Sequence, residues 1–257
     1  MPARSIALPV EHGAWGFLFE PALVGTILAP SFAAPFILLF FVGAFLVRQP
    51  LKFLIGDWLN SRRLPRTDLA LKFAGIYAAI TTVGLIGMFS LAPAASFVPL
   101  VGLAPLAAYL ISRDVSRKPR SLFTEIAAAL ALASSTTVFA LAGGWRYAPG
   151  YALWAIMLAH LIPSILYVRT RLRLEKGKPF SRAVPLAIYV LALGLLASFC
   201  YLGLSSILTL VMATFLMARA WFGLSPYRQI LKANVLGLWE LIYGLLYALS
   251  IVISQYR

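Results

Sequence analysis

The chain has 257 residues, of which 61% are hydrophobic and 12% charged, and its mean hydropathy is +0.89. A water-soluble globule cannot cover so much apolar surface, so the composition excludes a soluble enzyme, a disordered chain and a secreted disulfide scaffold. Although 22 Lys and Arg stand against 8 Asp and Glu, these basic residues lie between apolar runs, which indicates membrane topology rather than nucleic-acid binding. The single cysteine, Cys200, excludes an intramolecular disulfide and a metal site of several cysteines.

Nine apolar segments approach the roughly 20 residues that a helix needs to cross a bilayer. In chain order they cover residues 13–29, 33–54, 70–90, 96–112, 122–142, 150–170, 183–202, 204–222 and 234–254. The seventh and eighth are joined so closely at 203–205 that we expect a tight hairpin. The runs lack the period-two alternation of membrane strands. We therefore predict an all-α integral membrane protein with about nine transmembrane helices, forming a single domain over residues 1–257.

The charges of the connecting segments orient these helices. When the connections are assigned alternately to the two sides of the membrane, one set carries all but two of the 22 basic residues. That set consists of the N-terminus and regions 48–72, 113–120, 169–182 and 219–232. The opposite set, which includes the C-terminus, carries only Arg146 and Arg257. By the positive-inside rule, the N-terminus is predicted to be cytoplasmic and the C-terminus outside.

Ionisable residues at membrane depth cost about 2.5–3.5 kcal/mol each, so each one prompts a functional hypothesis. Glu11 and His12 precede the first segment, where they form either an interfacial anchor or a polar pair that closes over a cytoplasmic cavity. At the end of the second segment, Arg48 and Lys52 lie four residues apart and share a helix face. They either reach to lipid head groups or bind a phosphate or pyrophosphate, with Asp57 as a nearby carboxylate.

A second polar cluster connects the fourth and fifth segments. Tyr109 and Arg113 lie one helical turn apart at the end of the fourth segment. Glu125 lies early in the fifth segment, where the positive end of a helix favours a carboxylate. Its position near four basic residues also makes it a candidate counter-ion.

The sixth and ninth segments carry the deepest candidates. His160 has no second histidine or carboxylate nearby at metal-ligand spacing, so no metal site is predicted and a hydrogen bond to a neighbouring helix is the simpler interpretation. Nine residues later, Arg169 shares a helix face with Arg173. Glu240 shares a face with two tyrosines of the last segment, which makes it either a tyrosine-capped carboxylate or the counter-ion of a cation from the second or sixth segment.

Four pieces of the chain together resemble the YwiC-like family of bacterial multi-pass membrane proteins. They are EHGAWGFLFEPALVG, RSLFTEIAAALALA, IPSILYVRTRLR and the Gly-x-x-Glu of LGLWELIYGLLYAL. The resemblance implies a multi-pass protein of the bacterial cytoplasmic (inner) membrane. It implies no particular reaction, so whether the chain is an enzyme stays open.

A looser likeness is to the UbiA-type intramembrane prenyltransferase superfamily, whose members have nine helices, a cytoplasmic N-terminus and two Asp-rich motifs that hold a magnesium-bound pyrophosphate. IGDWLNSRRLPRT resembles the first motif and keeps Asp57 and Asn60, whereas the second motif falls on YVRTRLRLEKGKPFSRAVP, where Glu175 is the single carboxylate. Tyr109 and Arg113 stand where the superfamily has a tyrosine followed by a basic residue. The likeness implies a UbiA-like helical bundle in which arginines, instead of magnesium and its carboxylate ligands, would hold a phosphate.

The sequence thus predicts a cytoplasm-facing basic pocket that binds an anionic lipid or isoprenoid phosphate, with the bilayer as a partner and no nucleic acid. The residues expected at this site are Glu11, His12, Arg48, Lys52, Asp57, Asn60, Tyr109, Arg113, Glu125, His160, Arg169, Arg173 and Glu240. A UbiA-type prenyltransferase with degenerate Asp motifs is a second hypothesis, and the one case in which magnesium is expected as a cofactor. A transporter of a small anion or lipid and a non-catalytic scaffold protein are also compatible with the sequence.

Overall fold

The structure, a computed structural model, describes residues 3–9, 12–61, 64–115 and 121–255. Throughout these ranges the regular elements are helices, and no strand occurs in them. Their bounds are α1 Ala3–Ala7, α2 His12–Leu28, α3 Ala34–Trp58, α4 Pro65–Leu91, η1 Ala94–Phe97, α5 Val98–Val115, α6 Leu122–Ala133, α7 Ser135–Ala142, α8 Tyr147–Glu175, α9 Ala183–Tyr201, α10 Ile207–Gly223 and α11 Ala233–Gln255.

The structure confirms an all-helical, multi-pass membrane protein. Within the described residues, 7 helices are long and apolar enough to cross a membrane: α3, α4, η1 with α5, α6 with α7, α8, α9 and α11. The first and eighth predicted segments form shorter apolar helices, Trp15–Leu28 within α2 and Ile207–Gly223 as α10. Each predicted segment therefore coincides with a helix or a pair of consecutive helices, and seven of the nine meet the length of a membrane span.

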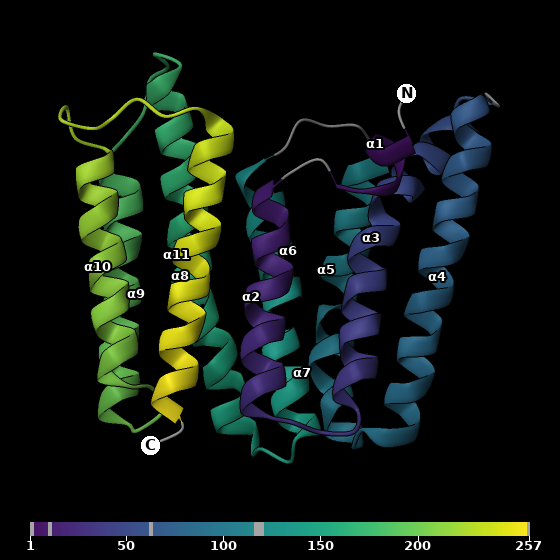
Figure 1. The fold of residues 1–257 in the computed structure, drawn as a ribbon, viewed down its shortest axis with the longest axis horizontal. Coiled ribbons are helices and arrows are strands. Elements are labelled where there is room, and N and C mark those ends of the chain that lie inside the picture. Colours follow the sequence, from purple (N-terminus) through teal and green to yellow (C-terminus); the bar gives the residue numbers. More distant parts are fainter. Residues whose placement is uncertain (1–2, 10–11, 62–63, 116–120, 256–257) are drawn as a thin grey trace.

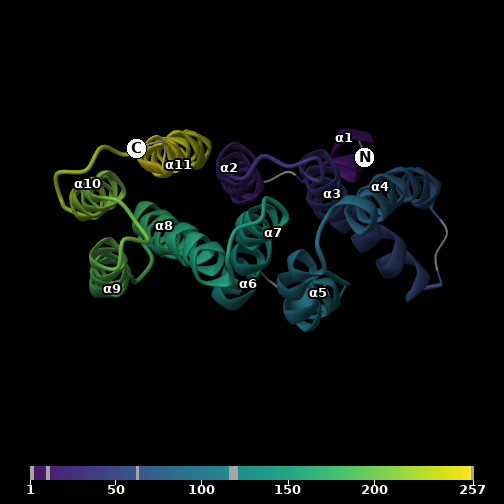
Figure 2. The same cartoon turned by 90° about the horizontal axis from the view of Figure 1, so that it is seen from below.

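The helices lie side by side in two rows. Figure 1 shows successive long helices running in opposite directions, with the two chain ends at opposite ends of the bundle. Seen from below in Figure 2, α11, α2, α3 and α4 form one row, and α9, α8, α6 with α7, and α5 form the other. We call the end at which α2 begins and α3, α5, α8 and α10 finish the basic end, and the opposite one the far end.

Two hydrophobic cores hold the rows together, and α2 and α7 contribute to both. Val24 of α2 and Ala140 of α7 pack with residues from α8, α9, α10 and α11. Leu18 of α2 and Phe139 of α7 pack instead with residues of α3 and α4. Large apolar side chains on the outer helices, such as Leu191, remain exposed, as expected for surfaces that contact lipid rather than water.

Local sequence explains two connections. The α9–α10 hairpin is confirmed: Gly203 adopts φ +70°, which favours glycine, and the backbone N–H of Leu204 donates to the carbonyl of Phe199 at 2.8 Å. In contrast, the run predicted as one segment over 122–142 is divided at Ser134 into α6 and α7. There Ser134 Oγ donates to the carbonyl of Ala131 at 2.7 Å, a side-chain bond that competes with the helix ladder.

Candidate functional site

A groove between α3 and α5 contains the first predicted pair of cations. It is a shallow groove whose cavity volume is about 10 Å³, and it is lined by Arg48, Leu51, Lys52, Ile55, Ile111 and Asp114. Arg48 Nη2 lies 2.7 Å from Asp114 Oδ2, and Arg48 Nε donates to the same oxygen at 2.8 Å. Lys52 is exposed and forms no ion pair within the described part of the chain. The groove therefore has two cations, one carboxylate and three apolar side chains.

Among the described contacts, Arg48 pairs with Asp114, whereas Asp57, suggested as a nearby carboxylate, pairs with Arg66. Asp57 is buried at the α3–α4 junction, where Arg66 Nη2 lies 2.6 Å from Oδ1 and Thr67 Oγ1 donates to Oδ2 at 2.8 Å. Its neighbour Asn60 donates to the carbonyl of Gly56 at 2.5 Å. The Asp57 carboxylate thus joins two helices, and the Asn60 amide closes the end of its own helix.

The cluster between α5 and α6 does not form one site. The ring of Tyr109 packs edge-on against Phe123, with 5.3 Å between ring centroids. Arg113 is half-buried, and its Nε atom has no hydrogen-bond partner within the described ranges, which omit residues 116–120. Glu125 acts as a counter-ion, but to Arg169 of α8, whose Nη1 lies 2.8 Å from Glu125 Oε1.

At the end of α8, Arg171 rather than Arg173 is the buried arginine. Arg171 is 2% exposed, and its Nε donates to Glu175 Oε1 at 2.7 Å. Its other nitrogens donate to the carbonyls of Gly223 and Gln229, so it ties α8 to the end of α10. The sequence analysis did not single out Arg171. Its spacing of two residues from Arg169 indicated only that it lies on a different face of the helix.

Two predicted site residues, Glu11 and His12, have side chains that lie outside the described part of the structure. Glu11 lies outside the described residues. His12 begins α2, and its side chain also lies outside the described part.

Glu240 belongs to a polar network in the interior of the bundle. Its Oε1 pairs with Arg219 of α10, and its Oε2 accepts a hydrogen bond from Ser164 Oγ of α8 at 2.6 Å. The Arg219 guanidinium lies over the rings of Tyr167 and Tyr243, at 4.4 and 4.6 Å from their centroids. The cation predicted from the second or sixth segment therefore comes from the eighth. Sequence reasoning missed it because Arg219 was assigned to a connecting loop.

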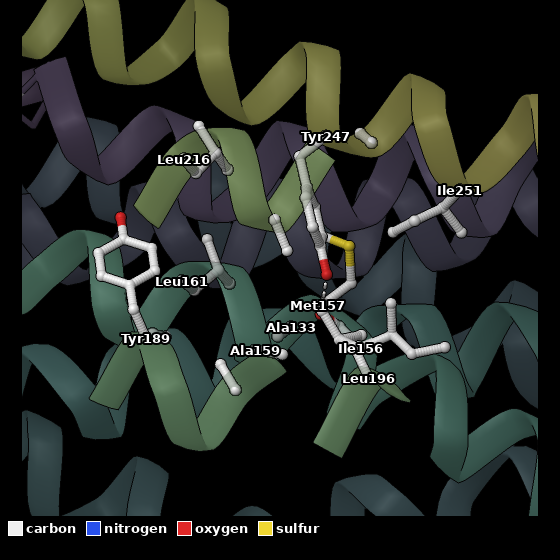
Figure 3. Packing of buried hydrophobic residues seen from close by; sticks show 14 of the residues in the cluster. Ala133, Ile156, Met157, Ala159, Leu161, Tyr189, Leu196, Leu216, Tyr247 and Ile251 are labelled. Carbon is white, nitrogen blue, oxygen red and sulfur yellow. Dashed lines mark hydrogen bonds between the residues drawn. The ribbon is translucent and has the colours of Figure 1, made fainter. Parts of the chain in front are cut away.

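A second buried pair joins α2 to α8. Glu20 and His160 are 3% and 2% exposed, and Glu20 Oε2 lies 3.5 Å from His160 Nε2. The imidazole stacks on Tyr247, with 4.7 Å between ring centroids. Figure 3 shows Tyr247 directed from α11 into the core, where its hydroxyl donates to the carbonyl of Ile156 at 2.9 Å. His160 therefore contacts α2 and α11, through the Glu20 carboxylate at 3.5 Å and the stacked ring of Tyr247.

The described residues contain no group of three or more His, Cys, Asp or Glu side chains that could hold a metal ion. The described contacts form separate cross-helix stations: the α3–α5 groove, the Asp57–Arg66 junction, the Glu125–Arg169 pair, and the interior pairs Glu20–His160 and Glu240–Arg219. Glu20 and Arg219 were not among the predicted site residues.

The chain is similar to a known protein family. A protein-family model described as YwiC-like protein matches residues 8–140, slightly more than half of the chain. No curated protein and no solved structure matches the chain. The matched range contains the groove and Glu20, whereas His160, Arg219 and Glu240 lie beyond it.

Proposed function

This chain belongs to the YwiC-like family, and from that premise we propose that it binds the phosphate group of an anionic lipid or isoprenoid phosphate at its basic end. We further propose nine membrane crossings in a bacterial cytoplasmic membrane, with the N-terminus cytoplasmic and the C-terminus outside. The basic end would then face the cytoplasm, where phosphorylated lipid precursors and anionic head groups are accessible.

The lengths and directions of the helices support nine crossings. The two shorter helices, α2 and α10, have 17 residues each and so extend about 25 Å, at the short end of the range for membrane helices. Both alternate in direction with their neighbours in Figure 1. With both counted, the cation-rich connections all fall at one end, as the positive-inside rule requires.

The composition of the α3–α5 groove carries the proposed ligand class. A lipid phosphate needs cationic donors next to apolar walls, and the groove combines Arg48 and Lys52 with Leu51, Ile55 and Ile111. Asp114 holds the Arg48 guanidinium by two contacts, so this cation is fixed before any ligand arrives. Lys52 keeps its full charge available, which leaves the groove with a net positive charge.

Asp57, at the α3–α4 junction, and Glu175, at the end of α8, do not fit the role of ligands to a magnesium-bound pyrophosphate. Both carboxylate oxygens of Asp57 are occupied by Arg66 and Thr67. Glu175, the single carboxylate in the stretch that resembles the second motif, pairs with Arg171 and Arg228. We therefore propose phosphate binding by side-chain cations and derive no magnesium-dependent transfer step from these residues.

The proposal is tested by native mass spectrometry of the detergent-solubilised protein titrated with phosphatidylglycerol, a bilayer lipid with one phosphate. Bound lipid should be retained by the natural protein and largely lost in the double variant R48Q/K52Q. The matched control is R173Q/K178Q, which removes the same charge from exposed positions at the same end.

Equal lipid retention in both double variants would refute the groove as the site. Lipid extracted from the purified protein and identified by tandem mass spectrometry then gives the ligand class. Enrichment of an isoprenoid phosphate or one acidic lipid, lost in R48Q/K52Q, supports the proposal, whereas a composition equal to that of the bulk membrane contradicts it.

A further inference from the structure

The Glu20–His160 pair differs from the ion pairs at the basic end in its depth and in its partners. Its two side chains come from α2 and α8 and are almost fully buried. Glu20 Oε2 and His160 Nδ1 are buried, and neither atom has a hydrogen-bond partner among the residues that the structure describes. Two unpartnered polar atoms at one buried site are unusual, because such groups cost about 1–3 kcal/mol each.

Glycine makes room for the Glu20 carboxylate against α11. A Cβ atom added at Gly244 would lie 2.0 Å from Glu20 Oε1, and one added at Gly16 would lie 2.7 Å from the same oxygen. Tyr247 covers the imidazole on another side, and its hydroxyl is engaged with a backbone carbonyl instead of with Glu20 or His160. The site is thus shaped around these two side chains.

The pair lies one helical turn from the Glu240 network. On α8, His160 and Ser164 are four residues apart, and on α11, Gly244 and Glu240 are also four apart. Ser164 donates to Glu240 and Gly244 contacts Glu20, so the two stations follow each other along the bundle. Glu240 and Ser164 therefore separate the Glu20–His160 pair from the basic end.

The Glu240 and Glu20 stations differ in the type of cationic residue that accompanies the carboxylate. Glu240 is neutralised by Arg219, and an arginine stays charged at every physiological pH. Glu20 is accompanied by His160 instead, and histidine is the residue type that serves as a proton acceptor and donor at physiological pH. A buried carboxylate without a cation is far more costly than a neutral one, so the Glu20–His160 pair requires a proton that the Glu240–Arg219 pair does not.

The other helices around the pair bring few titratable groups to it. From α11, which packs on α2, come Glu240, Tyr243 and Tyr247; α7 carries no titratable side chain. From α6 comes Glu125, which is paired with Arg169 of α8, and from α3 come Arg48, Lys52 and Asp57, toward its basic end. Around α8, the titratable groups are Arg219 on α10 and, on α9, Tyr189, Cys200 and the exposed Tyr201.

We propose that Glu20 and His160 form a proton-binding site within the membrane domain. The pair holds one proton, as a carboxylic acid beside a neutral imidazole or as a carboxylate beside an imidazolium, with 3.5 Å between Glu20 Oε2 and His160 Nε2. The proton exchanges with the basic end past Ser164 and Glu240. This site is independent of the lipid groove, which lies between other helices.

Carbodiimide labelling tests the proposal, because a hydrophobic carbodiimide modifies carboxyl groups in their protonated form. The purified protein is treated across about pH 5 to about pH 8, the range in which histidine changes charge, and digested for mass spectrometry. We expect an adduct on the peptide that contains Glu20, falling as the pH rises and absent in E20Q. The peptide that contains Glu240 serves as an internal control and should stay unmodified because of Arg219.

Modification of Glu20 and Glu240 to the same extent would overturn the proposal, as would a Glu20 adduct that does not change with pH. If no adduct forms at Glu20, infrared difference spectra between acidic and alkaline buffer decide whether the reagent failed to enter. A protonated-carboxyl band that is absent in E20Q and present in D68N supports the site, and its absence from the natural protein refutes it. In H160Q the pH dependence of that band should shift, which a purely structural contact would not cause.

Discussion

Asp114 sets the charge of the α3–α5 groove, because it is the one carboxylate among the six residues that line it. We expect D114N to increase the affinity for phosphatidylglycerol by about fivefold, since one charge near a membrane surface contributes about 1 kcal/mol. Titration by native mass spectrometry measures the change. D68N, which removes the same charge from an exposed position on α4, should leave the affinity unchanged. Weaker binding by D114N would show that Asp114 acts mainly by holding Arg48.

Glu240 is expected to be the most costly acidic residue to neutralise. E240Q would leave the Arg219 charge buried without its carboxylate partner, which typically costs about 3–5 kcal/mol. E125Q breaks the more exposed Glu125–Arg169 pair, for which about 1 kcal/mol or less is expected. Thermal unfolding of the two variants in detergent compares them. An equal fall in melting temperature would contradict the buried character of the Arg219 pair.

Residue types were predictable from the sequence, whereas their partners across helices were not. The i, i+4 spacing that places Arg48 and Lys52 together acts within one helix and can be read directly. The partner of Arg48, Asp114, lies 66 residues away on α5, and this pairing depends on how helices pack. Arg219 was missed for the same reason, because its position near the end of an apolar segment gave no sign of its depth.

Among the helices, α3 and α4 depend on glycine for their close packing. A Cβ atom added at Gly84 would lie 2.4 Å from the backbone nitrogen of Phe40, whereas one added at Gly75 meets nothing within 4 Å. We expect G84A to lower the free energy of unfolding by about 1–3 kcal/mol through overpacking. G75A, in the same helix, should be neutral or stabilising by up to about 1 kcal/mol because alanine favours helix.

Melting temperatures of G84A and G75A test this contrast, and similar values for both would show that α3 and α4 can separate at no cost.

Gly84 and Gly87 are three residues apart and so lack GxxxG spacing. That motif describes one geometry of helix pairing, whereas these two glycines each meet α3 at Phe36 or Phe40.

Helix positions were largely predictable because membrane spans require long apolar runs, and α9 and α10 begin within three residues of the predicted bounds. The division of 122–142 into α6 and α7 was not, since this run contains neither proline nor glycine before Gly143. It results from hydroxyl side chains, among them Thr136, whose Oγ1 donates to the carbonyl of Ala133 at 2.8 Å. Serine and threonine can occupy helix interiors as well, so their presence alone does not predict a break.

The whole molecule is expected to cross the membrane nine times. Because Cys200 is the single cysteine, C200S provides a cysteine-free background. In this background, L202C at the α9–α10 turn should react with a membrane-impermeant maleimide added to intact cells. K178C, at the basic end, should react only after the membrane is opened. Reaction of both or of neither in intact cells would contradict the proposed topology.

For the whole molecule, the distribution of charge between the two ends could be predicted from the sequence, whereas the arrangement of the helices could not. The basic connections could be assigned to one side because the positive-inside rule depends on loops alone. The two rows and the two cores that join them, to both of which α2 and α7 contribute, depend on side-chain fit inside the bilayer. Packing there receives no hydrophobic driving force, so hydropathy does not reveal which helices are neighbours.

The connections at the far end have a consequence for biosynthesis. Among them, Arg146 is the one charged side chain within residues 29–33, 92–97, 143–146 and 202–206. Transfer of charged residues across a bilayer is the costly step of insertion, so α2–α3, α4–α5, α6/α7–α8 and α9–α10 can each enter as a pair with little penalty. Arg219 of α10 precedes Glu240 of α11 in the chain, so this ion pair can close only after both helices have entered. We therefore expect the α10–α11 contact to form later than the contacts within each of these pairs.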